Sequence, residues 1–173
     1  GGTDWARTIN TNLARACREF GMGMGLGSCR SLLFSNATLP DFDVRHLIGE
    51  EQPLYANLGI AQLEQLIERN ELERVTELIS KLRADGLIIH VNPLQEWLQP
   101  EGDRFKKPPL ETIIQVLEAL PHVRFIVKEV GQGMGPESLR ALLKLPLAAV
   151  DFAAGGGVNF ALLELLRSDP GKL

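Results

Sequence analysis

Four polar side chains of different chemistry lie close together near the middle of the chain. The apolar run 86–91 contains His90 and is followed by Asn92, Gln95 and Glu96. An imidazole, two amides and a carboxylate at this spacing can bind a polar ligand and hold or transfer a proton. A single histidine is more often a core residue with internal partners, but the close spacing of these four residues favours a site.

A lysine interrupts a second apolar run. Lys128 lies within the stretch 125–130, where a buried ammonium group is costly unless it is paired. Because successive strand residues point to opposite faces, the neighbouring Glu129 is not the expected partner. Lys128 therefore has either a structural partner elsewhere or an anionic or electron-rich ligand, and we favour the ligand.

Glycines cluster at two places where a ligand can approach the backbone. Between residues 21 and 27 they alternate with larger residues, and the bare backbone permits close packing or contact with a flat ring. Gly155, Gly156 and Gly157 precede a helical pattern, where free N–H groups can bind a phosphate. Each cluster also has a simpler interpretation, as a packing or loop feature, which the residues alone favour.

The apolar patterns predict alternating strands and helices. Strands are expected over 21–28, 54–59, 86–91, 125–130 and 148–153, and helices over 5–20, 40–48, 61–83, 110–120, 136–145 and 159–166. Repeated strand–helix units indicate a parallel sheet in an α/β fold. Both a doubly wound sheet and a (β/α)₈ barrel fit this pattern, but the barrel usually needs about 250 residues. With five units after an opening helix, a barrel here would be incomplete, and we expect one partial domain over 1–173.

The predicted strands bring the polar candidates to one edge of the sheet. Each strand is followed or ended by polar residues, which are Ser28, Arg30, Asn57, His90, Asn92, Lys128 and Asp151. Ligands of parallel α/β folds bind outside the carboxyl ends of the strands. We therefore expect these side chains to share one binding site.

The composition excludes several classes of protein. The chain has 173 residues, 45% of them hydrophobic and 23% charged, which is typical of a soluble globular protein and not of a disordered or fibrous one. The net charge of -4 and the lack of a basic stripe argue against nucleic acid as the main partner. No apolar run can span a bilayer, and no secretory signal is visible. Cys17 and Cys29 lack metal-ligand spacing, so we expect two reduced thiols in a cytoplasmic protein.

Several blocks resemble one enzyme family in the same order. The stretch 86–96 with its His-x-Asn-x-x-Gln-Glu pattern, followed by Gln99-Pro100-Glu101-Gly102-Asp103-Arg104, is similar to the signature of type 2 isopentenyl diphosphate isomerase. Further similar blocks are Gly27-Ser28-Cys29-Arg30, Ala56-Asn57-Leu58-Gly59 and Val127-Lys128-Glu129-Val130-Gly131, and Gly1-Gly2-Thr3 resembles the end of a family loop. The resemblance covers essentially the whole chain.

This resemblance implies an FMN-dependent enzyme of isoprenoid biosynthesis on a (β/α)₈ barrel. It implies that isopentenyl diphosphate and dimethylallyl diphosphate are interconverted by an allylic proton shift that needs reduced FMN and Mg²⁺, with NADPH as the reductant. It further implies a cytoplasmic homo-oligomer, either a tetramer or an octamer.

The resemblance also implies roles for individual residues. FMN would contact Thr3, Ser28, Asn57, Lys128, Gly156 and Gly157. His90, Asn92 and Gln95 would line the pocket where catalysis occurs. Arg30 and Gln95 would bind the substrate, with Arg30 on its diphosphate, and Glu96 would bind Mg²⁺.

The sequence departs from the family pattern in places, and rival functions stay open. Val158 follows Gly156-Gly157 where the family has threonine, and the basic N-terminal motif and C-terminal glycine loops of the family are missing. One rival is another FMN-barrel oxidoreductase, related to hydroxy-acid oxidase or inosine-monophosphate dehydrogenase. A second rival is a non-catalytic fragment that binds flavin or diphosphate.

Overall fold

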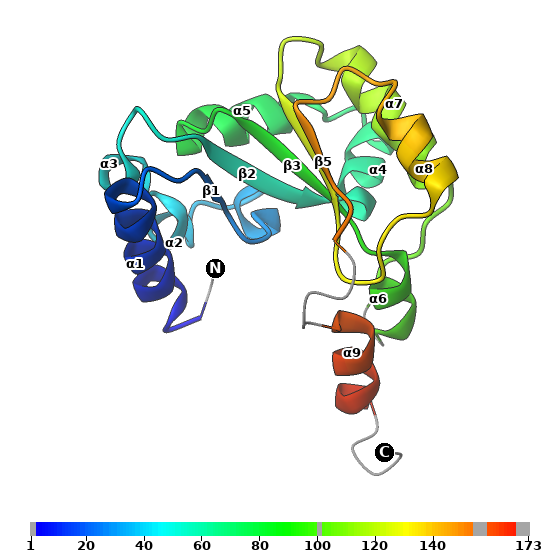
Figure 1. Cartoon of the computed structure of the whole chain (residues 1–173), viewed down its shortest axis with the longest axis horizontal. Coiled ribbons are helices and arrows are strands. Elements are labelled where there is room, and N and C mark those ends of the chain that lie inside the picture. Colours follow the sequence, from blue (N-terminus) through cyan, green and yellow to red (C-terminus); the bar gives the residue numbers. More distant parts are fainter. Residues whose placement is uncertain (1–2, 100–101, 154–158, 169–173) are drawn as a thin grey trace.

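The fold is built on one parallel β-sheet with five strands, in a computed structural model that describes residues 3–99, 102–153 and 159–168. The strands are β1 (Met24–Gly25), β2 (Leu54–Gly59), β3 (Gly86–Val91), β4 (Phe125–Glu129) and β5 (Ala149–Asp151). They lie side by side in chain order, and the sheet curls into a half-barrel (Figure 1). The predicted α/β fold with parallel strands is therefore confirmed. A doubly wound sheet needs a reversal of strand order, which is not present among these strands.

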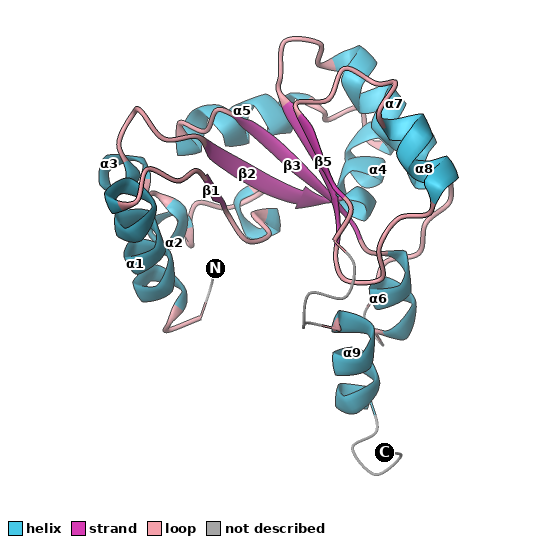
Figure 2. Ribbon diagram, viewed as in Figure 1, coloured by secondary structure: helices cyan, strands magenta, loops and turns pink. Residues whose placement is uncertain are grey.

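Helices connect the strands and cover one face of the sheet (Figure 2). They are α1 (Ala6–Glu19), α2 (Leu39–Phe42), α3 (Arg45–Ile48), α4 (Ile60–Glu68), α5 (Glu73–Leu82), α6 (Pro93–Leu98), α7 (Pro109–Ala119), α8 (Pro136–Leu142) and α9 (Phe160–Ser168), with a 3₁₀ turn, η1 (Arg30–Leu32). None of the helices in the described ranges is long and apolar enough to cross a lipid bilayer.

Three predicted elements were wrong in extent. The helix expected over 61–83 is two helices, because Asn70 takes a left-handed conformation with φ of 55° between them. Asparagine tolerates that conformation better than most residues. The helix expected over 40–48 is likewise divided into α2 and α3, and the strand expected over 21–28 is reduced to β1.

The two faces of the sheet differ in burial. Leu58, Ile89 and Val127 belong to the face under the helices, and each is completely buried. The opposite face carries Ile126, which is only half-buried, and its neighbour on β3, Ile88, which is 9% exposed. The apolar core thus lies between sheet and helices, and the other face remains open enough to meet a ligand.

The amino-terminal ends of the strands are closed by a buried arginine. Arg45 of α3 is 1% exposed, and its guanidinium donates to the backbone oxygens of Arg83, Gly49 and Gln52 at 2.8 to 3.0 Å. It also pairs with the Asp85 carboxylate at 2.7 Å. The same carboxylate oxygen of Asp85 accepts a hydrogen bond from the backbone N–H at the start of β2, so this network joins α3, β2 and the turn before β3.

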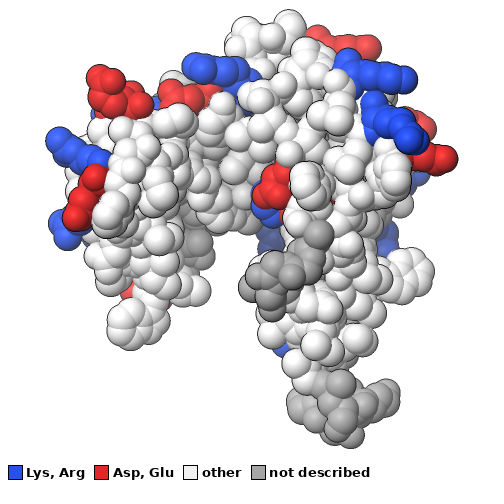
Figure 3. All heavy atoms as spheres, viewed as in Figure 1, with Lys and Arg blue, Asp and Glu red and all other residues white. Residues whose placement is uncertain are grey.

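Figure 3 shows a hollow between the part of the molecule that carries α1 and the part that carries α6 and α9. Most acidic and basic atoms on this face lie toward its outer margins. The apolar side chains of Ile9 and Leu13 on α1, and of Trp5 just before it, are at least half exposed, whereas Ala14 and Cys17 pack inward.

Candidate active site at the carboxyl ends of the strands

A row of neighbouring residues crosses the sheet near its carboxyl edge. Strand pairing places Gly59 of β2 beside His90 of β3, His90 beside Lys128 of β4, and Lys128 beside Asp151 of β5. Residues paired in this way point to the same face of a parallel sheet. The sequence predicted that His90 and Lys128 share one end of the sheet, and the register shows that they are direct neighbours.

His90 is held as a neutral imidazole. Its Nδ1 lies 2.7 Å from Oδ1 of Asn57, an acceptor, so Nδ1 carries the proton and Nε2 is left as an acceptor. Burial and the nearby Lys128 charge lower the pKa of His90 to about 4. His90 is therefore a neutral hydrogen-bonding group at pH 7.

Lys128 makes only one hydrogen bond within the described residues. Its Nζ donates to the backbone oxygen of Glu129 at 2.8 Å. The Glu129 carboxylate faces elsewhere, as predicted, and accepts the N–H groups of Gly131 and Gly133 at 2.6 and 2.9 Å. The structural ion pair considered for Lys128 is thus not made in the described part of the chain, and the half-buried ammonium retains capacity for a ligand.

Three predicted site residues meet on α6 and the residue before it. The Asn92 side-chain N–H₂ group donates to Oε1 of Glu96 at 2.9 Å and to Oε1 of Gln95 at 3.3 Å. Asn92 is 4% exposed, and its Oδ1 has no hydrogen-bond partner among the residues that the structure describes. A buried oxygen without a donor is uncommon in native structures, so this atom points to a ligand or water that donates to it.

Glu164 belongs to this cluster but was not predicted from the sequence. This carboxylate on α9 is 2% exposed and accepts from the side-chain amides of Gln99 at 2.7 Å and Gln95 at 3.4 Å. Its other oxygen pairs with Arg167. The sequence signal that could have identified Glu164 is helical spacing, which places it on the same helix face as the buried Ala161.

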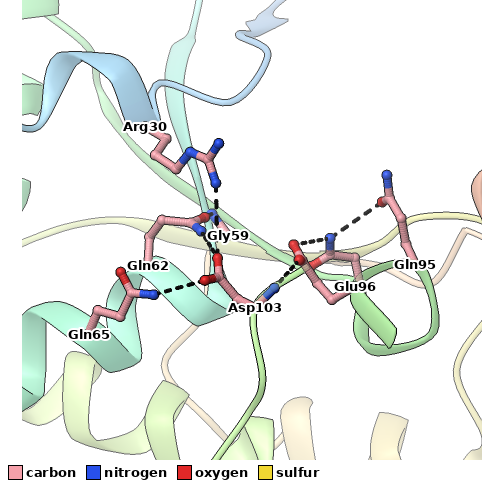
Figure 4. A network of polar contacts seen from close by, with 8 residues as sticks. Arg30, Gly59, Gln62, Gln65, Gln95, Glu96 and Asp103 are labelled. Carbon is pink, nitrogen blue, oxygen red and sulfur yellow. Dashed lines mark hydrogen bonds and ion pairs between the residues drawn. The ribbon is translucent and has the colours of Figure 1, made fainter. Parts of the chain in front are cut away.

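Arg30 reaches the cluster through a second residue that was not predicted, Asp103. The Arg30 guanidinium lies 4.0 Å from the Asp103 carboxylate, which also accepts from the side-chain amides of Gln62 and Gln65 on α4. Figure 4 shows that this network continues to Glu96, which accepts the backbone N–H of Asp103 at 2.9 Å. Arg30 lies between β1 and β2, α4 lies between β2 and β3, and Asp103 lies between β3 and β4, so all three connections meet at this place.

The remaining candidates are not joined to this network in the described residues. Thr3 and Ser28 are exposed, and neither side chain makes a hydrogen bond or ion pair with another candidate residue in the described part of the chain. Gly156 and Gly157 lie outside the described residues. A Cβ at Gly25 would lie 2.6 Å from Ile88 Cδ1, so packing alone accounts for that glycine, whereas a Cβ at Gly27 would meet open space.

The described residues hold no group of three or more His, Cys, Asp or Glu side chains arranged to bind a metal ion. Glu96 therefore does not belong to a complete metal site made by the described residues, and a cation there needs further ligands from its substrate or from water. Cys29 is completely buried, and burial raises the pKa of its thiol to about 11. Such a thiol is poorly suited to act as a nucleophile.

The fold is that of an α/β protein, and a cluster of polar candidate residues lies at the carboxyl edge of its curled parallel sheet. No family model matches the chain. The chain is 39% identical over 168 residues to the isopentenyl-diphosphate delta-isomerases of Rickettsia typhi and Rickettsia prowazekii, and 38% identical to that of Rickettsia akari. Each match covers 97% of the chain and 48% of the relative, so the chain spans about half the length of the curated relatives it matches.

Proposed function

We propose that the chain is part of a type 2, FMN-dependent isopentenyl diphosphate isomerase built on a (β/α)₈ barrel. The observation that carries the proposal is that similar blocks far apart in the sequence converge on one site. Arg30, Asn57, His90, Asn92, Gln95, Glu96 and Lys128 all lie at the carboxyl edge of the sheet. The relatives at 39% identity carry the name of this isomerase activity.

The chemistry of the site fits a reduced flavin. The half-buried Lys128 ammonium suits the negative charge that reduced FMN carries along the N1/O2 edge of its ring, and the neutral Asn57–His90 pair adds hydrogen bonds without further charge. The exposed Ser28 and the open space at Gly27 leave room beside the backbone. When bound, reduced FMN would supply the proton transfer for which these residues offer no strong acid, and NADPH would keep it reduced.

Glu96 fits a Mg²⁺ ion that is shared with a diphosphate. Magnesium is commonly held by one or two carboxylates together with phosphate oxygens and water. Both oxygens of Glu96 already accept one N–H, which orients the carboxylate, and each keeps a further lone pair for a cation. Arg30, with 69% of its side chain exposed, would bind the diphosphate at the same mouth.

The chain's own residues would orient the substrate during the proton shift. The Gln95 amide is held with Oε1 toward Asn92 and its N–H₂ group toward Glu164. We propose that Gln95 holds the allylic carbons in place, while the unpaired Oδ1 of Asn92 and Nε2 of His90 accept hydrogen bonds. We also propose, from the resemblance, a cytoplasmic tetramer or octamer.

The decisive test is isotope exchange. We expect the chain, supplied with reduced FMN and Mg²⁺ in D₂O, to incorporate deuterium into isopentenyl diphosphate and form dimethylallyl diphosphate. Glu96→Gln should weaken the Mg²⁺ dependence and leave flavin binding nearly intact, whereas Lys128→Met should loosen the flavin. Bound flavin without any exchange would favour a non-catalytic flavin-binding fragment, and no flavin binding would contradict the proposal.

The oxidoreductase alternative gains no support from the site. A dehydrogenase of the inosine-monophosphate type needs a reactive thiol on a loop. Cys29 is buried, its pKa is raised to about 11, and its sulfur faces the backbone oxygen of Gly27 at 3.3 Å. Cys29 is therefore not suited to be the reactive thiol of such a dehydrogenase.

A further inference from the structure

A short segment between α6 and α7 crosses the mouth of the site. Residues 102–108, here named the strap, run from α6 toward α7 and lie against α4. At the start of the strap, a Cβ built on Gly102 would overlap the backbone carbonyl of Glu96. Only glycine allows so close an approach, and it brings the next residue, Asp103, directly beside Glu96.

Asp103 contacts three separate elements of the mouth. Its Oδ2 accepts from Gln62 at 3.0 Å and its Oδ1 from Gln65 at 3.1 Å, both on α4. Its backbone N–H donates to Glu96 Oε2 on α6 at 2.9 Å. Its carboxylate also faces the Arg30 guanidinium of η1 at 4.0 Å, as Figure 4 shows.

The orientation of the Gln62 amide makes an acceptor necessary at position 103. Gln62 is 6% exposed, and its Oε1 accepts the backbone N–H of Gly59 at 3.1 Å. The N–H₂ group of Gln62 must therefore face Asp103 and would be left without a partner if that side chain were apolar. An unpaired buried donor of this kind is costly, because it has lost its hydrogen bonds to water without gaining a partner in the protein.

The contact with Arg30 is weaker than these hydrogen bonds. It is long, and 69% of the Arg30 side chain is exposed, so solvent screens the ion pair. Exposed pairs of this kind contribute little to stability. Arg30 is thus oriented toward the mouth but remains free to turn to a bound anion.

We propose that Asp103 is a positioning residue that holds Arg30 and Glu96 at the separation needed to bind one Mg²⁺–diphosphate group together. The inference rests on the proposed function, in which Arg30 binds the diphosphate and Glu96 the metal ion. Asp103 does not touch the ligand. It acts by orienting the Glu96 carboxylate through the backbone N–H and by placing the strap between α4 and α6.

The strap has a second attachment that is independent of Asp103. The backbone N–H of Lys106 donates to both carboxylate oxygens of Glu64 at 3.1 and 3.2 Å, and its ammonium pairs with Glu68 at 2.8 Å. Removing the Asp103 side chain therefore leaves the strap on α4 but frees the segment nearest Glu96. Because the strap stays attached through Lys106, a loss of binding in a variant of Asp103 would report on positioning at Glu96 and not on detachment of the whole strap.

The test is the affinity of the chain for inorganic pyrophosphate with Mg²⁺, measured by titration calorimetry. We expect Asp103→Ala to weaken binding at least about tenfold, the usual effect of losing a residue that orients a metal ligand. Asp103→Asn should stay within about threefold, because it keeps an acceptor for Gln62 and the exposed Gln65 amide can turn. Lys106→Gln, the matched change elsewhere in the strap, should stay within about twofold.

The outcomes distinguish this inference from the proposed function. If Arg30→Ala and Glu96→Gln weaken binding but Asp103→Ala does not, the inference is wrong and the ligand roles stand. If Asp103→Asn or Lys106→Gln loses as much affinity as Asp103→Ala, Asp103 has no specific positioning role. If neither Arg30→Ala nor Glu96→Gln changes the affinity, both proposals fail. Should Asp103→Ala not fold, Gln65→Ala removes one of the same bonds from an exposed helix position and should cost a few-fold.

Discussion

The two ends of the sheet each hold a buried polar network, but the networks differ in completeness. At the amino ends, Arg45 uses its Nε and both terminal nitrogens on three backbone oxygens and on Asp85. At the carboxyl ends, Asn92 Oδ1 has no partner, and Lys128 has one backbone bond in the described residues. The polar groups of the amino-end network are bonded to one another, whereas the carboxyl end keeps hydrogen-bonding capacity that the described residues do not use.

This difference shows how stability and binding are divided in the fold. Parallel β/α proteins bind ligands at the carboxyl ends of their strands, and the opposite ends contribute mainly to stability. A satisfied network tolerates loss of a member poorly, because the remaining buried groups are left unpaired. Changes at the amino end should therefore affect folding, and changes at the carboxyl end should affect protonation and binding.

Arg45 should produce the largest effect on stability. Arg45→Met leaves three backbone oxygens and the Asp85 carboxylate without their shared donor, so we expect a loss of about 3–5 kcal/mol in unfolding free energy. Denaturant titration of the folded chain measures it. Arg15→Ala, an exposed arginine on α1, is the control and should change stability by less than about 0.5 kcal/mol. Equal losses of unfolding free energy in the two variants would show that the Arg45 network contributes no more to stability than an exposed arginine does.

His90 should make stability depend on pH. Its pKa is lowered to about 4 in the fold from an ordinary value of 6.5, so below pH 6.5 the unfolded chain gains a proton that the folded chain does not accept. The native state therefore loses stability as pH falls, by about 2 kcal/mol between pH 7 and pH 5. His90→Asn removes this titration while keeping a donor toward Asn57.

The measurement compares unfolding free energies of the wild type and His90→Asn across that pH range. We expect the two curves to run parallel above pH 7 and to separate below pH 6.5, with the variant less sensitive to acid. Curves that stay parallel down to pH 5 would mean that the His90 imidazole is not protected from protonation.

Gly59 should have an effect on stability of similar size, and this effect reaches the site directly. A Cβ there would overlap Gln62 Oε1 and lie 2.7 Å from Nε2 of His90, and both side chains are held by other bonds. We expect Gly59→Ala to cost about 1–3 kcal/mol and to shift the His90 pKa, as followed by proton NMR. Gly27→Ala, where a Cβ meets open space, is the control and should leave both quantities unchanged. An unaltered His90 pKa in the Gly59→Ala variant would mean that the imidazole does not lie beside Gly59.

Cys29 should show the smallest effect. Because burial raises the pKa of this thiol to about 11, we expect almost no thiolate at pH 8 and very slow labelling by a disulfide reagent in the folded chain. Cys17 is also buried, so its sulfur should likewise be shielded from the reagent in the folded chain. Unfolding in denaturant should expose both thiols, and rapid labelling before unfolding would contradict the closed packing around Cys29.

The sequence alone predicted those parts of the fold that depend on local pattern. Strands β2 and β3 have the predicted bounds, because continuous apolar runs between turn residues favour buried parallel strands. The candidates His90, Asn92, Gln95 and Glu96 could be selected because residue type and spacing carry the chemistry.

Tertiary structure decided which distant residues meet, because contacts across strands and loops leave no periodic signal in the sequence. The register of β3 on β4 makes Lys128 the neighbour of His90, and the path of the strap joins Asp103 to Glu96. Glu164 is buried while Leu162 of the same helix is 43% exposed, which reverses the expectation from hydrophobicity. Burial depends on what packs against a helix face, and amino-acid type alone cannot supply that information.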